Sequence, residues 1–129
     1  MTREEYRVDG MPDPISHYTD AVRAGELLFL SGIVPVDEGG RLVGGDDVVS
    51  QATAVFEGLR RVLAAAACSP GDVVKVTVFL TDVDDRAAIN PVRQAFFGAA
   101  RPASTLIEVS RLAVPGAKIE VDAVAVLPS

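Results

Sequence analysis

The sequence predicts an α+β domain in which two helices pack on one face of a mostly antiparallel sheet. Apolar runs of strand length, bounded by turn residues, lie at residues 27–32, 73–80 and 119–127. A long stretch after Asp46 instead has apolar residues at helical spacing, and Asn90 with the proline that follows it predicts the start of a second helix. Because β-structure precedes each helix and short turns join the early strands, we expect both helices on one side of the sheet.

The first forty residues are expected to form extended segments joined by turns. Residues 5–10 predict an edge strand, and the two prolines of the next loop block regular strand pairing. A turn at Gly25 joins residues 18–22 to the apolar run 27–32, which indicates a hairpin. A second turn, at residues 37–40, then returns the chain.

The first predicted helix has one apolar face, because its apolar residues recur at steps of three and four. These residues are Val48, Ala52, Val55, Phe56, Leu59, Val62, Leu63 and Ala66. Either Asp46 or Asp47 can cap the helix, since an aspartate carboxylate accepts hydrogen bonds from the free amides of the first turn. The helix is expected to end at residues 69–71, where proline and glycine follow a serine.

The middle of the chain predicts a strand and then a short helix. Residues 73–80 alternate as a strand with Lys75 and Thr77 on one face, and we expect this strand near the centre of the sheet. The polar segment that follows is expected to be irregular or a short helical turn. Asn90 is then predicted to cap a short helix over residues 91–97, because proline loses nothing where its amide has no partner.

The last two strands place charged residues on one sheet face. Residues 101–112 alternate as a strand entered from a proline-marked loop, where a small-molecule site could lie. The final strand, residues 119–127, has Glu120 and Asp122 on one face and apolar residues on the other. Together with Lys75 and Thr77, these carboxylates make this sheet face too polar to be the dry core of a monomer. A wet cavity lined by several subunits would explain such a face.

Composition excludes several classes of protein. The 129 residues fit one domain, which we place at residues 1–129. No apolar run approaches the ~18 residues that a membrane span needs. The acidic N-terminus does not resemble a signal peptide, so we expect a cytoplasmic protein without a membrane partner. The net charge of −6 opposes binding to nucleic acid, whose affinity for proteins comes largely from lysine and arginine.

We expect neither a metal nor another cofactor. His17 is the only histidine, and no cysteine or histidine stands near it at ligand spacing. Cys68 is the only cysteine, so it cannot form an internal disulfide. It lies at the alanine-rich end of the predicted helix, where a packing role is expected rather than a nucleophilic one.

Several segments together resemble one known family. Pro102-Ala103, Thr105 and Glu108-Val109 fall without a gap on the pattern Pro-Ala-Arg-Ser/Thr-x-Val-Glu-Val-x-x-Leu, which is typical of the RidA (YjgF) family of reactive imine/enamine deaminases. The other matching segments are Tyr18 with Ala21-Val22, residues 29–32 with Pro35, residues 72–80, Asp84-Asp85, Asn90 with Phe96-Phe97, and residues 119–121. The resemblance spans residues 14–126. It implies the chorismate-mutase-like (RidA) fold and a homotrimer with clefts between its subunits.

The resemblance also implies which residues form the site. Glu120 matches the glutamate that positions or activates water, and it is the predicted catalytic residue. The predicted substrate-binding residues are Tyr18, Ser31, Gly32, Asn90, Ser104 and Thr105. Ser104 stands where the family has its substrate-binding arginine. A serine hydroxyl cannot reproduce the two parallel hydrogen bonds by which arginine fixes a carboxylate.

Each of these residues also has a structural interpretation. Glu120 could pair with Lys75 or Lys118 on the sheet face, and Asn90 is explained as a helix cap. Tyr18 could be a packing residue and Ser31 a strand-end residue, while Ser104 could fill an unused arginine position. Alternatively, Arg101 or Arg93 could reach the cleft and supply the missing cation.

Two functions follow from this site. The first is hydrolytic deamination of a small imine or enamine, because a protonated imine needs only a held water and a group that moves its proton. From Ser104 alone, we expect a substrate without the free carboxylate of an amino-acid-derived imine. The alternative is a non-catalytic homotrimer that binds a small metabolite in the same clefts.

Overall fold

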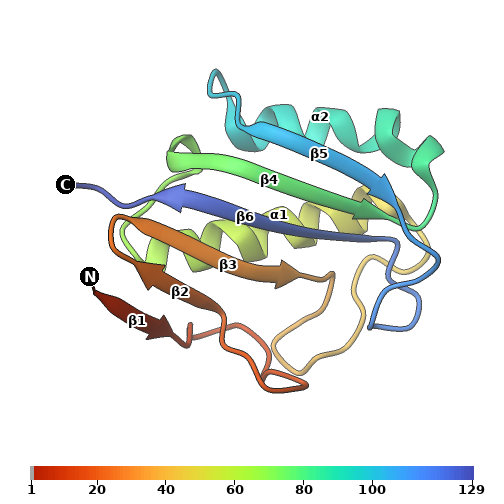
Figure 1. The fold of residues 1–129 in the computed structure, drawn as a ribbon. Helices are drawn as coiled ribbons and strands as arrows, with labels where there is room; N and C mark the ends of the chain where they lie inside the picture. Colours follow the sequence, from red (N-terminus) through yellow and green to blue (C-terminus); the bar gives the residue numbers. More distant parts are fainter. Residues whose placement is uncertain (1) are drawn as a thin grey trace.

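The computed structural model describes residues 2–129 and shows two layers, a six-stranded sheet and two helices that cover one of its faces (Figure 1). The strands lie in the order β1-β2-β3-β6-β4-β5. Their bounds are Arg3–Tyr6 for β1, Ala21–Ala24 for β2, Leu27–Ile33 for β3, Val73–Leu80 for β4, Ala103–Glu108 for β5 and Ile119–Val126 for β6. Every pairing is antiparallel except β4 with β5. The predicted α+β fold class is therefore confirmed.

Helix α1, Val48–Ala65, packs its predicted apolar face against the sheet. Val55 and Leu59 are fully buried there, because helical spacing places both on the stripe that faces β3 and β6. Asp47 is the cap, and its carboxylate accepts a hydrogen bond from Ser50 N at 3.1 Å. Of the two aspartates predicted for this role, Asp47 therefore fills it.

Helix α2, Arg86–Phe97, begins five residues earlier than the sequence predicts, so Asn90 lies inside the helix and does not cap it. The chain is already turning before the helix, because the Asp82 carboxylate accepts a hydrogen bond from Asp84 N at 2.9 Å and starts the 3-10 turn Val83–Asp85. Ile89 is fully buried and anchors the early turns of the helix. Pro91 is tolerated inside the helix at the loss of one backbone hydrogen bond.

The predicted strand positions need several corrections, and strand β5, for example, covers only Ala103–Glu108 of the predicted residues 101–112. Strand β1 is an edge strand, as predicted, but it ends at Tyr6 rather than extending over residues 5–10. The chain leaves the sheet there because Val8 N donates to the buried Asp20 carboxylate at 2.8 Å, and Arg7 pairs with the same carboxylate. Strand β4 is interior, between β6 and β5, although β3 and β6 are the two middle strands.

Strands β4 and β5 are joined through α2, which makes residues 73–108 a strand-helix-strand unit with parallel strands. The unit forms the upper edge of the sheet in Figure 1, and β5 is its outermost strand.

No layer formed by residues 2–129 covers the second face of the sheet. Large apolar side chains on this open face remain exposed, among them Leu27 and Phe29 of β3, Ile107 of β5 and Val126 of β6. The alternation predicted for the last strand is confirmed, because Ile119, Val121, Ala123 and Ala125 are buried while Glu120 and Asp122 face the open side. A monomer would leave this mixed apolar and charged face in water.

Candidate functional site

Glu120 is the second residue of β6 and lies half-buried on the open face. Neither lysine proposed as its partner is paired with it: Lys118 Nζ lies 3.3 Å from Asp46 Oδ1, and Lys75 Nζ donates to Thr105 Oγ1 at 2.6 Å. Burial raises the pKa of the Glu120 carboxyl above its usual range, and the negative charge of Asp122 raises it further. The structure therefore presents a carboxylate whose ionised form is disfavoured and which no cation of residues 2–129 neutralises.

A bulge in β3 makes room for this carboxylate. Leu30 pairs with Ala123 and Ile33 with Val121, so Ser31 and Gly32 together oppose the single residue Asp122. A Cβ atom on Gly32 would lie 2.1 Å from Glu120 Oε2, far inside van der Waals contact. Glycine at position 32 is thus what allows the Glu120 side chain to lie across the strand.

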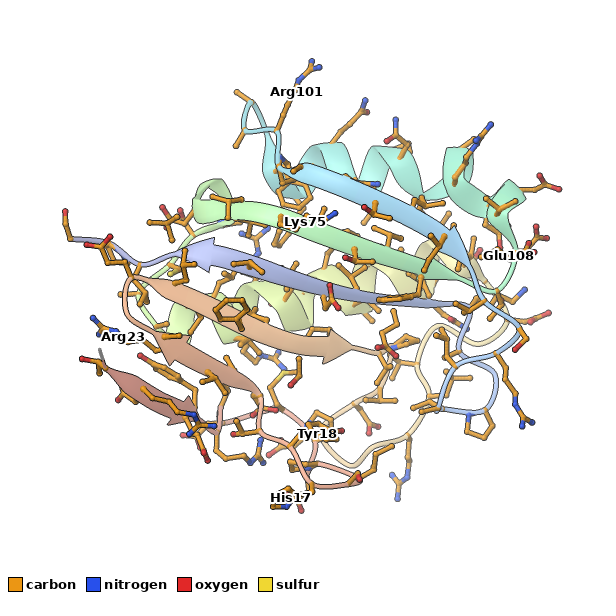
Figure 2. The ribbon with its side chains drawn as sticks, viewed as in Figure 1. His17, Tyr18, Arg23, Lys75, Arg101 and Glu108 are labelled. Atoms are coloured by element: carbon orange, nitrogen blue, oxygen red, sulfur yellow. The ribbon has the colours of Figure 1, made fainter. Side chains whose placement is uncertain are left out.

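The Glu120 hollow is a recess of about 360 Å3 that several of the predicted site residues share. Its lining is Ile15, Ser16, Tyr18, Ser31, Gly32, Val34, Ala113, Val114 and Glu120. The Tyr18 hydroxyl accepts a hydrogen bond from Ile15 N at 3.3 Å, which leaves its own proton free to donate. Figure 2 shows Tyr18 on the loop beneath the sheet. The Ser31 hydroxyl donates to Thr19 O at 2.6 Å and keeps only its acceptor capacity.

The arginine hollow, a second recess of about 670 Å3, contains two other predicted residues, Asn90 and Ser104. Its lining is Asn90, Arg93, Gln94, Phe97, Gly98, Ala100, Arg101, Pro102 and Ser104. Arg93 Nη2 donates to Ser104 Oγ at 2.9 Å. Of the two arginines considered as substitutes, Arg93 is the one that contacts Ser104, whereas Arg101 extends away from the fold in Figure 2.

The two hollows lie on opposite faces of the sheet within one chain. Ser104 shares its face with Leu106, which packs against the helix-covered core, whereas Glu120 is on the open face. Thr105 also faces the open side, where it binds Lys75 and lines neither hollow. A single chain therefore brings together Glu120, Tyr18, Ser31 and Gly32, and separately Asn90 and Ser104.

Gln51 is a residue that the sequence analysis missed. It is fully buried, and its amide joins two loops: Nε2 donates to Gly45 O at 2.8 Å and Gly116 O at 3.0 Å, while Oε1 accepts from Lys118 N at 2.7 Å. These bonds fix the chain immediately before β6 and so help to place Glu120. The sequence feature that could have identified Gln51 is its position: it is a polar residue on the apolar face of the predicted helix, one turn after Val48.

Over residues 2–129, the structure has no group of three or more side chains arranged to hold a metal ion. No helix in the same range is long and apolar enough to cross a membrane.

Comparison with known proteins assigns the family. The sequence profile of the family described as Endoribonuclease L-PSP, which is the RidA (YjgF) family, matches residues 9–127. The chain belongs to the RidA family. A RutC family protein of Pyrococcus horikoshii is 40% identical to this RidA chain over 124 residues, which are 95% of the chain and 97% of the relative.

Two further RidA relatives have names or ligands that describe small-molecule chemistry. The 2-iminobutanoate/2-iminopropanoate deaminase of Salmonella typhimurium is 37% identical and covers 92% of this chain and 93% of its own. The crystal structure of Escherichia coli TdcF with bound serine superposes with a TM-score of 0.85 at 34% identity, covering 96% of this chain and 100% of that one. The RidA fold predicted from the resemblance is therefore confirmed.

Proposed function

We propose that this RidA protein hydrolyses a small reactive imine or enamine and releases ammonia. The observation that carries the proposal is the unpaired Glu120 carboxylate, whose pKa burial and Asp122 raise, in a hollow beside Tyr18. A general base works best when its pKa lies near the operating pH, and burial moves a glutamate in that direction. The deaminase activity named for the Salmonella relative supports the same chemistry.

In the proposed reaction, Glu120 takes a proton from a bound water as the water oxygen attacks the carbon of the protonated imine. The carbinolamine that forms has both the new hydroxyl and the old amino group on one carbon. Glu120 then returns the proton to nitrogen and takes up the hydroxyl proton as the C–N bond breaks and the C=O bond forms. The departing ammonia accepts that proton, so a carbonyl compound and an ammonium ion leave and Glu120 is again ionised. An enamine enters the same sequence after gaining a proton on carbon, which converts it to the iminium.

The proposed site lies between subunits. The Glu120 hollow and the arginine hollow are on opposite faces of the sheet in one chain, so only a second copy can bring Glu120 near Asn90 and Ser104. The exposed apolar residues of the open face, such as Phe29 and Ile107, offer the surface against which such copies would pack. We propose a closed homotrimer in which each cleft takes one hollow from each of two neighbours.

The assembly can be measured directly. Multi-angle light scattering at micromolar concentration is expected to return about 40 kDa, three times the 13.5 kDa mass of the chain. A monomer mass under these conditions would contradict a site shared between subunits.

The proposed base also predicts a shift in pH dependence. Since only ionised Glu120 can accept a proton, kcat/KM should rise as pH increases through its raised pKa. Asp122→Asn removes the neighbouring negative charge and should lower that pKa, so the acidic limb of the profile moves to lower pH. Glu26→Gln, an equal charge change at an exposed turn, should leave the limb in place. An Asp122→Asn profile that matches the wild type would show that another group controls the limb.

The alternative is a non-catalytic trimer that binds a small metabolite in the same clefts, and Ser104 at the family's arginine position favours it. Ammonia release from a panel of freshly generated imines separates the two functions. Hydrolysis above the spontaneous rate supports the deaminase, and binding of imine analogues without ammonia release supports the alternative.

A further inference from the structure

We propose that Arg93 binds a carboxylate of the ligand and that the ligand is therefore an imine or enamine bearing a free carboxylate. The inference rests on the proposed function for the reacting group, but the anion site rests on the geometry around Arg93. Arg93 on helix α2 thus supplies the positive charge that Ser104 on strand β5 cannot supply.

The Arg93 side chain has unused hydrogen-bonding capacity. A guanidinium carries five N–H donors, and within residues 2–129 the one side-chain partner of Arg93 is Ser104 Oγ at 2.9 Å. No carboxylate of the same residues lies in salt-bridge range of Arg93. The bond to Ser104 fixes one arm of the guanidinium and leaves donors available for an incoming anion.

The surroundings of Arg93 are positive in a protein whose net charge is −6. Arg93 and Arg101 line the arginine hollow, and Arg86 lines a smaller recess next to it that also includes Arg93 and Asn90. No aspartate or glutamate lines either recess, and no described ion pair involves any of the three arginines. An anion is therefore attracted to this part of the chain rather than repelled by it.

Partial burial of Arg93 increases the free energy that its guanidinium gains when it binds an anion. Arg93 is half-buried, and desolvation lowers the pKa of its guanidinium, although not enough to neutralise an arginine. A cation that has lost part of its water and has no counter-ion gains more from binding an anion than a fully solvated one does. Arg101, by contrast, is exposed and extends into solvent (Figure 2).

Ser104 is small enough to allow this arrangement. An arginine at position 104 would place a second positive charge where Arg93 now meets the serine hydroxyl, so the two cations would compete for one site. Ser104 instead accepts a hydrogen bond from Arg93 and orients it. The position of Arg93 therefore replaces the expectation, based on Ser104 alone, that the ligand lacks a carboxylate.

The experiment compares a carboxylate-bearing imine with its carboxamide analogue, each generated in the assay. Arg93→Gln should lower kcat/KM for the carboxylate imine by about 10- to 100-fold, mainly through a higher KM, because a charge-assisted bidentate contact is lost. For the carboxamide the change should stay within about threefold. Arg41→Gln, an equal charge change at an exposed turn, should behave as the wild type toward the pair. Arg101→Gln, which removes an exposed charge at the rim of the arginine hollow, should lose less activity on the carboxylate imine than Arg93→Gln does.

A relocated arginine provides a second test. Ser104→Arg in the Arg93→Gln background should restore most of the activity on the carboxylate imine, because the cation then enters the hollow from β5. Equal losses on both imines in Arg93→Gln, or the selective loss appearing in Arg101→Gln instead, would overturn the assignment to Arg93.

Failure of the proposed hydrolysis is distinguishable from failure of the anion site. If the wild-type trimer releases no ammonia from any imine, calorimetric titration with pyruvate, a small 2-oxo acid, still tests Arg93. Pyruvate binding that is lost in Arg93→Gln and kept in Arg41→Gln supports the carboxylate site without hydrolysis. Absence of pyruvate binding to the wild type, or equal binding to Arg93→Gln, overturns the inference.

Discussion

Glu120→Gln is expected to lower kcat for imine hydrolysis by about 10²- to 10⁴-fold, the usual contribution of a general acid-base residue. Glutamine has nearly the same shape as glutamate and fits the space beside Gly32, but it cannot accept a proton from water. The measurement is steady-state ammonia release at saturating substrate, so that a change in substrate binding does not enter the rate.

Glu26→Gln is the matched control for this variant, because it removes the same charge at an exposed turn outside the Glu120 hollow. Light scattering should show the same mass for both variants, since Glu120 makes no ion pair within residues 2–129 that the fold would lose. Full activity in Glu120→Gln would remove Glu120 from the chemistry and leave its hollow as a binding surface.

Gln51→Ala should be the most destabilising single substitution considered, at about 3–5 kcal/mol of unfolding free energy. Truncation leaves Gly45 O, Gly116 O and Lys118 N without their buried partner, and each unsatisfied buried group costs about 1–3 kcal/mol. The measurement is urea unfolding at fixed protein concentration, because assembly makes the midpoint depend on concentration.

Thr53→Ala, on the same helix, is the control for Gln51→Ala. The Thr53 side chain is exposed and donates only to Val49 O, so its loss should change the unfolding free energy by less than about 0.5 kcal/mol. A Gln51→Ala cost as small as that would mean that water or loop movement replaces all three bonds.

Local patterns in the sequence predicted those elements whose form is set by their own residues. Strand β4 begins and ends at the predicted residues, because buried and open positions alternate without a break from Lys75 to Leu80, after a shift of register between Val73 and Lys75. The start of helix α2 was misplaced because it depends on the Asp82 carboxylate and on burial of Ile89. In the sequence, Asn90-Pro91 is a stronger indication of a helix start than either of these residues. Strand β1 was misplaced for a similar reason, since Asp20 draws residues 7 and 8 away from the sheet.

The candidate site was predictable to the extent that family positions could be matched along the sequence. Glu120, Tyr18, Ser31 and Gly32 line one hollow because β3 and β6 are neighbours, which the resemblance implied through its fold. Two of the three hydrogen bonds of Gln51, those to Gly116 and Lys118, were not predictable, because they join residues 65 and 67 positions apart. The contact between Arg93 and Ser104 depends on the side-chain direction of α2, which begins earlier than its sequence signal indicates.

The parallel pairing of β4 and β5 through α2 has a consequence for how such proteins can diverge. Asn90, Arg93 and Ser104 all come from that one contiguous unit, whereas the Glu120 hollow is assembled from loops and strands spread between Ile15 and Glu120. Under the proposed assignment of Arg93, ligand preference can change by substitutions within residues 86–104, and the residues around the Glu120 carboxylate need not change with it. Exchanging residues 86–104 between two family members should therefore transfer the ligand preference of the donor. Each recipient should keep its own reaction, because its Glu120 hollow is unchanged.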